Sequence, residues 1–153
     1  MDCINWLSSY EERRRCSMKK LTNMAFIYAI LALVGGVFFR EFTKFNDFTG
    51  ITSLSVMHTH YLILGVGVAL LVLILERTVT NNQLLTKKLV VLYNVGLNTT
   101  CIMFLVRGIT QVLGTSLASG ANAAISGIAG LGHIMLGISI IWGLVRLKKI
   151  VAE

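Results

Sequence analysis

The stretch that decides the fold is HTHYLILGVGVALLVLILER, residues 58–77. Its central part, residues 61–75, contains no charged side chain and ends at Glu76 and Arg77. About 20 predominantly apolar residues in a helix cross the roughly 30 Å hydrocarbon core of a bilayer. We therefore predict a membrane-spanning helix over residues 54–75, with two histidines near one end.

Three further stretches match this one in length and apolar composition. We expect spans over residues 21–39, 89–106 and 125–145 in addition to residues 54–75. Hydrophobic residues make up 55% of the 153-residue chain and charged residues 14%, a balance that excludes a soluble domain. Backbone polar groups find no water in lipid, so each span must be a helix. The expected fold is all-α, an integral membrane four-helix up-and-down bundle.

Residues 1–17 are polar and differ in composition from the rest of the chain. Met18 is an equally natural start, so this piece is either a polar cytoplasmic extension or the product of a start site placed too early. We expect one transmembrane domain over residues 18–153, and we assign no function to the extension.

The basic residues lie in short blocks beside the apolar spans. Eleven of the 14 lie before the first span, between the second and third, or after the fourth: Arg13, Arg14, Arg15, Lys19, Lys20, Arg77, Lys87, Lys88, Arg146, Lys148 and Lys149. The other two connections hold only Arg40, Lys44 and Arg107. The positive-inside rule then places both termini in the cytoplasm, as in a multi-pass protein of the cell (cytoplasmic) membrane. The same blocks explain the formal charge of +7 without a nucleic-acid partner.

Three histidines lie within or at the edge of the predicted spans: His58 and His60 in the second, and His133 in the fourth. Ionisable side chains inside a membrane are costly, which makes them candidates for function. Counted from the inner boundary at about 1.5 Å per residue, His60 and His133 lie at similar depths near the outer face. Two imidazoles from different helices at one depth suit the axial positions of a single b-type haem iron.

Other residues of these spans complete the haem hypothesis. Gly130 and Gly137 lie about one turn on either side of His133 and would leave room for a flat macrocycle. Arg40 and Arg107 follow the ends of the two outward-running spans, where a guanidinium suits pairing with a haem propionate.

His58 and His60 cannot both face one central ligand on a regular helix, because residues two apart point roughly 200° apart. A weak likeness between the halves of the chain, each with an Arg at a span end and then a His before a Leu-Gly pair, slightly favours His60. The choice between the two stays open. A purely structural interpretation also stands, in which each histidine is solvated or bonds a neighbouring hydroxyl or amide.

A copper or zinc site on His60 and His133 is a weaker alternative to haem. The only sulfur-containing side chains beside the histidines are those of Met57 and Met135.

The third span is the most polar, with Asn94 and Asn98 one turn apart on the same face. We expect these amides to hold the bundle together through hydrogen bonds between helices. In a functional alternative, Asn98 or Thr99 would bond the second nitrogen of a ligand histidine.

Several function classes lack the residues they need. Four-span multidrug exporters depend on a carboxylate in the membrane interior, and the predicted spans contain none. Cys3, Cys16 and Cys101 form no pair at a useful spacing, which argues against a disulfide catalyst or a zinc framework. Nucleotide-binding loops, nucleophile elbows and zinc-protease motifs are also absent.

Part of the chain resembles a known family. The motifs are FFREFTKF at residues 38–45, FTG at residues 48–50, and His58-Thr59-His60 followed by Leu64-Gly65. They resemble an uncharacterised family of small bacterial four-span membrane proteins, a domain of unknown function, over about residues 18–147.

A more distant likeness concerns the histidines alone. His-x-His followed by Leu-Gly is similar to the histidine-bearing helices of haem–copper oxidase subunit I and its small four-span relatives. This likeness implies haem ligation by His60 or His58, together with His133. The chain is too short and has too few histidines for a haem–copper centre, so oxygen reduction by this chain alone is excluded.

The leading hypothesis is a membrane protein that binds one haem b near its outer face for electron transfer, haem handling or sensing, without independent catalysis. The alternative is an accessory subunit without a cofactor, which packs against a membrane protein partner or forms a homo-oligomer. A small-solute channel or transporter is the third and weakest hypothesis.

Overall fold

The computed structural model describes residues 2–80 and 84–152, with the side chains of residues 2–11, 13 and 14 left out. The helices are α1 (Asp2–Phe45), α2 (Leu54–His60), the π-helical segment η1 (Tyr61–Gly67), α3 (Val68–Thr78), α4 (Lys87–Val112) and α5 (Ser119–Ala152). No strand occurs within the described ranges. Four helical stretches are long and apolar enough to cross a membrane: Arg15–Phe45, Leu54–Thr78, Lys87–Val112 and Ser119–Ala152. The predicted all-helical fold with four spans is confirmed.

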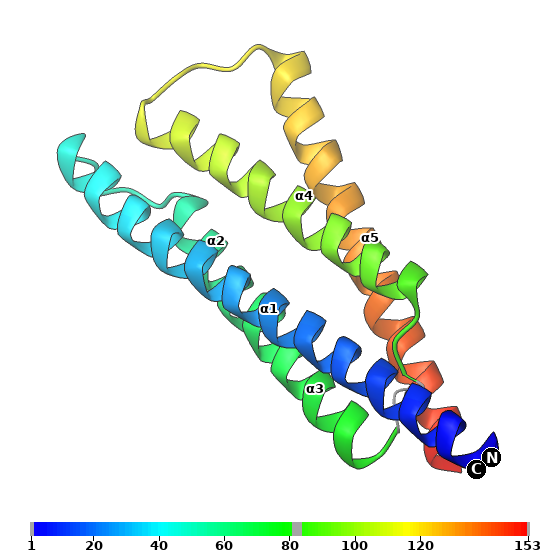
Figure 1. Cartoon of the computed structure of the whole chain (residues 1–153). Coiled ribbons are helices and arrows are strands. Elements are labelled where there is room, and N and C mark those ends of the chain that lie inside the picture. The colour runs from blue at the N-terminus through cyan, green and yellow to red at the C-terminus, as the bar shows by residue number, and fades with distance from the viewer. Residues whose placement is uncertain (1, 81–83, 153) are drawn as a thin grey trace.

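The four spans form two pairs of helices. The first pair is α1 with the continuous run α2–η1–α3, and the second is α4 with α5 (Figure 1). α2 and η1 also touch α4, whereas α5 packs substantially against α4 alone. Both ends of the chain lie at the same end of the bundle, which we call the terminal end; we call the opposite one the far end (Figure 1). Which end faces the cytoplasm stays a prediction.

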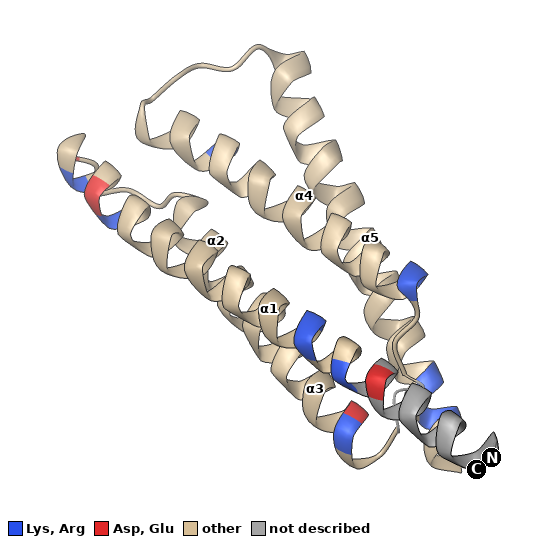
Figure 2. Cartoon of the chain, in the orientation of Figure 1, with Lys and Arg blue, Asp and Glu red and all other residues tan. Residues whose placement is uncertain are grey.

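Charged residues of the described part of the chain gather toward the two ends of the bundle, and few lie in its middle (Figure 2). Most of the described Lys and Arg lie at the terminal end, and a smaller group lies at the tip of α1 at the far end (Figure 2). Long apolar side chains such as Phe26, Leu33 and Ile63 are about two-thirds exposed, as expected for surfaces that face lipid.

The second span is irregular immediately after His60. The seven residues of η1 take the wider π-helical turn, and the backbone carbonyl of Leu64 there accepts a hydrogen bond from the Tyr93 hydroxyl at 2.6 Å. Gly65 lies so close to α1 that an added Cβ would stand 2.6 Å from the Tyr28 ring. A π-helical turn commonly marks a functional or strained place in a helix, and the sequence did not reveal this one.

A polar network lies inside the bundle between α1, η1 and α4. The Tyr28 hydroxyl donates to the Asn94 side chain and accepts from the Asn98 amide at 3.0 Å. The Tyr61 hydroxyl donates to the side-chain oxygen of Asn98 at 3.3 Å. The expectation that Asn94 and Asn98 bond other helices is therefore confirmed.

Glycines bring α4 and α5 into close contact. A Cβ added at Gly96 would stand 2.9 Å from the backbone nitrogen of Leu136, and one at Gly132 would stand 3.0 Å from that of Thr100. Small residues at a helix crossing let backbones approach closely in membranes. This contact sets the position of α5, because α5 has no other large contact within the described part of the chain.

Candidate functional site

His60 and His133 are each held by their own helix. Nδ1 of His60 lies 2.8 Å from the carbonyl oxygen of Val56, and Nδ1 of His133 lies 2.9 Å from that of Ala129. A carbonyl oxygen can only accept, so Nδ1 carries a proton in this contact. In the neutral ring the lone pair is then on Nε2, which is the form in which imidazole binds a metal.

The structure brings the same two histidines together. Their ring centroids are 6.2 Å apart, and the ring planes are nearly perpendicular, at 85°. The ring of Phe104, from α4, contacts both of them, with its centroid 4.9 Å from that of His60 and 5.8 Å from that of His133. Three helices therefore converge on one ring cluster, which consists of His60, Phe104 and His133.

His58 points to a different part of the bundle. Its ring stacks on Phe39 of α1, with centroids 6.2 Å apart, and it lies beside the glycine pair Gly35 and Gly36. Its Nδ1 is buried and has no hydrogen-bond partner among the described residues. His58 thus faces α1, whereas His60 faces α4 and α5. Of the two, only His60 lies beside His133.

The glycines around His133 leave its face of α5 open. A Cβ added at Gly130 or at Gly137 would meet no atom within 4 Å, and His133 itself is exposed. Ser126 and His133 of this face contact Arg107 and Phe104 of α4, whereas Gly130 and Gly137 meet no described atom. α5 instead packs through Gly132, which is buried against α4, because only that face matches the close approach of the two backbones.

The two arginines expected beside the histidines have different surroundings. Arg107 spans from α4 to α5, where its Nη2 donates to the Ser126 hydroxyl at 2.6 Å. The Arg40 side chain is 80% exposed and lies 3.7 Å from the carboxylate of its neighbour Glu41. Within the described ranges, no hydrogen bond or ion pair joins Arg40 to Arg107 or to a histidine.

The alternative role of Asn98 or Thr99 as the partner of a ligand histidine is wrong for the observed arrangement. Nδ1 of each clustered histidine already bonds a carbonyl of its own helix. Asn98 donates to the Tyr28 hydroxyl and to the Asn94 carbonyl, so its amide is occupied by the polar network.

Sequence analysis missed Glu76, which it placed just beyond a span. The structure places it within the spanning helix, only 1% exposed. Its carboxylate accepts from the Thr80 hydroxyl and from the backbone nitrogen of Leu85, each at 2.8 Å. Arg146 donates to the adjacent carbonyl of Leu84 at 2.9 Å. The carboxylate therefore holds the α3–α4 connection at the terminal end, rather than standing in the middle of the membrane.

No group of three or more His, Cys, Asp or Glu side chains suited to a metal ion occurs among the described residues. An apolar groove of about 320 Å³ lies between α1, α2 and α4, with Tyr61 and Cys101 in its wall, and none of the histidines lines it. Two potential ligands, His60 and His133, therefore lie together in the ring cluster, outside this groove.

No curated protein and no solved structure matches the chain, so the distant likeness to haem–copper oxidase subunit I has no support. A family model described as a protein of unknown function, DUF2871, matches residues 18–150 and covers all four spans. The chain therefore belongs to this DUF2871 family of proteins of unknown function.

Proposed function

We propose that this membrane protein binds one b-type haem, with His60 and His133 as the axial ligands of its iron. The observation that carries the proposal is the paired arrangement of these two imidazoles. They come from different spans, lie side by side in the ring cluster, and each bonds a carbonyl of its own helix through Nδ1, which leaves Nε2 as the nitrogen available to a metal. Haem iron accepts imidazole nitrogen in both axial positions.

The separation of the rings is suited to one iron between them. A metal–imidazole nitrogen bond measures about 2 Å, so two imidazoles on opposite sides of one ion have ring centroids roughly 6 Å apart. The observed separation is 6.2 Å.

The number of ligands favours haem over a bare ion. A structural zinc ion takes four protein ligands and a catalytic one takes three, and the described residues offer no such group. The porphyrin supplies four equatorial nitrogens itself, so two histidines complete the coordination of its iron. Copper or zinc stays the weaker candidate.

The space for the macrocycle is open on one side and filled on another. Gly130 and Gly137 leave the face of α5 beside His133 without protein atoms. The Phe104 ring, in contrast, contacts both imidazoles. A haem held by His60 and His133 would have to displace this ring, which a change of side-chain rotamer could do.

When bound, the haem would supply a one-electron redox centre, or a site for a diatomic ligand once one of the two imidazoles has left the iron. The chain contributes the two imidazoles, their orientation through the bonds to Val56 and Ala129, and an apolar surrounding. These contributions suit electron transfer, haem handling or sensing, and none of them supplies a catalytic group.

Absorption spectra of the protein purified in mild detergent, before and after addition of dithionite, test the proposal. We expect a Soret band that sharpens on reduction, with resolved α and β bands. His60→Ala and His133→Ala should lose the bound haem. His58→Ala is the matched control and should keep it, because His58 faces α1. Unchanged haem content in His133→Ala would contradict the proposal.

The accessory-subunit hypothesis has one observation in its favour. α5 packs substantially against α4 alone, and apolar side chains such as Leu131, Ile134 and Ile141 are about 60% exposed along it. A partner helix could cover this surface, although lipid would cover it equally well. Purification of a stoichiometric membrane partner, together with a protein that takes up no added haem, would favour this second function.

A further inference from the structure

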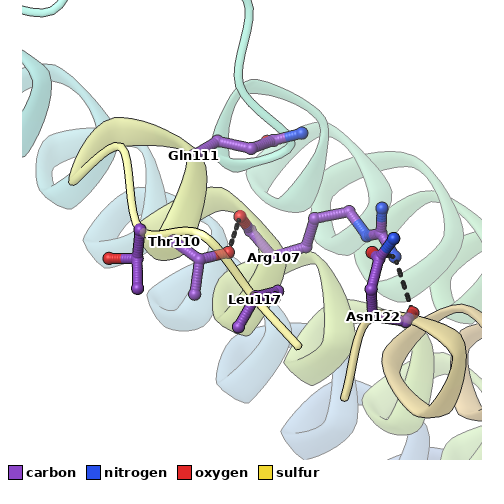
Figure 3. Close-up of a pocket in the computed structure, with 6 residues that line it drawn as sticks. Arg107, Thr110, Gln111, Leu117 and Asn122 are labelled. Atoms are coloured by element: carbon purple, nitrogen blue, oxygen red, sulfur yellow. Dashed lines mark hydrogen bonds between the residues drawn. The ribbon is translucent and has the colours of Figure 1, made fainter. Parts of the chain in front are cut away.

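A polar pocket of about 210 Å³ lies at the far end, between the end of α4, the connection that follows it and the beginning of α5 (Figure 3). Its lining residues are Arg107, Thr110, Gln111, Thr115, Leu117 and Asn122. One of the six is positively charged, four are polar and neutral, and none is acidic. The pocket therefore favours an anion.

The charged group of the pocket is fixed in position. Nη2 of Arg107 donates to the Asn122 side-chain oxygen at 3.2 Å, to the Asn122 carbonyl at 3.4 Å and to the Ser126 hydroxyl at 2.6 Å. No hydrogen bond from Nη1 or Nε to a described residue is present. Arg107 is thus held at one nitrogen, and its other donors remain for a ligand. Fixing a guanidinium in advance reduces the entropy lost on binding.

A second donor comes from Gln111. Its side-chain oxygen accepts from the backbone nitrogen of Ser53 at 2.8 Å, which leaves the amide nitrogen as the end that can donate to a ligand. Figure 3 shows the side chains of Gln111 and Arg107 extending from α4 in a similar direction. An anion there would meet a full positive charge and a neutral N–H donor, an arrangement that suits phosphate oxygens.

The geometry points to a binding site for the phosphate of an anionic lipid headgroup, with Arg107 as the charged contact. The pocket lies where two spans end, which is the level of lipid headgroups when these helices cross a bilayer. Lipid phosphate is concentrated at that level, and an arginine suits it by charge and by hydrogen-bond geometry.

The pocket and the ring cluster share no residue, although Phe104 lies about one helical turn before Arg107 on α4. Asn122, in the pocket wall, precedes His133 by eleven residues of α5, or about 16 Å at the usual helical rise. The inference therefore does not rest on the haem proposal.

Native mass spectrometry of the full chain in detergent, titrated with phosphatidylglycerol, tests the site. Arg107→Gln should weaken retention of the first lipid about tenfold or more, because it removes a charge-assisted contact. Arg40→Gln is the matched control: it removes an arginine from the same end of the bundle, but one that is exposed and lines no described pocket. It should change lipid affinity less than about twofold.

Leu117→Trp is a second test, because it fills the pocket and keeps the Arg107 contacts with α5. It should also weaken lipid retention about tenfold. Equal lipid affinity in the wild type, Arg107→Gln and Leu117→Trp would overturn the proposal, and so would an equal loss in Arg40→Gln. Competition by millimolar inorganic phosphate as strong as that by the lipid would overturn the choice of a lipid headgroup.

Discussion

Replacement of Gly132 by Ala tests the contact that positions α5. A Cβ at this residue would stand 2.5 Å from the Thr100 hydroxyl oxygen, 3.0 Å from the Thr100 nitrogen and 3.1 Å from the Gly96 carbonyl oxygen. Two of these three atoms belong to the backbone of α4, so they cannot turn away as a side chain can. The helices must therefore separate by a few tenths of an ångström.

The magnitude follows from two opposing effects. Overpacking of a tight contact costs about 1–3 kcal/mol. Replacement of glycine by alanine within a helix returns up to about 1 kcal/mol. Because all three contacts are at or below 3.1 Å, the overpacking cost lies in the upper part of its range, about 2–3 kcal/mol. The Gly132 variant should therefore lose about 1–2 kcal/mol in free energy of unfolding, which lowers the ratio of folded to unfolded protein roughly 5- to 30-fold.

Gly130→Ala is the matched control for this prediction. The two positions lie on the same helix, but a Cβ at Gly130 meets no atom within 4 Å. Equilibrium unfolding in mixed detergent micelles should show a less stable Gly132→Ala protein, and a Gly130→Ala protein that is as stable as the wild type or slightly more so. Equal stability of the two variants would refute the assigned packing of α4 against α5.

Three further predictions concern other contacts. Tyr93→Phe should cost about 1 kcal/mol, the scale of a hydrogen bond inside a membrane protein, and should speed hydrogen exchange in η1, because the Leu64 carbonyl loses its partner; unchanged exchange would argue against that contact. Glu76→Ala should destabilise the protein by about 1–3 kcal/mol and speed exchange at the Leu85 amide, which loses its acceptor; Glu76→Gln, which keeps an acceptor oxygen, should be milder. Phe104→Ala should speed haem uptake in stopped-flow mixing, because it empties the space beside both imidazoles; slower uptake would show that the ring helps to hold the haem.

The four spans and the proximity of two histidines could be predicted from the sequence for simple reasons. Span length is set by bilayer thickness, and depth follows from counting residues inward from the basic blocks. This count of residues predicts similar depths for His60 and His133, and in the structure the two rings lie side by side. Which of two neighbouring histidines faces α5 depends on the rotation of the helix about its axis. Depth alone does not fix this rotation.

Features that depend on contacts between helices could not be predicted. The π-helical turn at η1 accompanies the Tyr93 bond to the Leu64 carbonyl, two residues that lie 29 positions apart. Phe104 enters the ring cluster only because α4 lies beside both α2 and α5. Glu76 was placed outside the membrane because charge marks the ends of spans. Its burial depends on the connection between α3 and α4, in which the backbone nitrogen of Leu85 donates to the Glu76 carboxylate.

The face through which α5 packs could not be predicted either. Ser126, Gly130, His133 and Gly137 share one face by helical spacing, and small residues there suit either a neighbouring helix or a bulky ligand. The packed glycine is Gly132, which lies on another face. A glycine-rich span contains more than one face of small residues, and its partner helix decides which of them is used.

The most direct test of the central claim is the electron paramagnetic resonance spectrum of the oxidised, haem-loaded protein. The account predicts a low-spin ferric signal from two imidazole ligands. Because the ring planes of His60 and His133 are 85° apart, this signal should be strongly anisotropic, as is typical of perpendicular axial imidazoles. His58→Ala should give the same signal. A high-spin signal in the wild type, or a low-spin signal that persists in His133→Ala, would contradict the account.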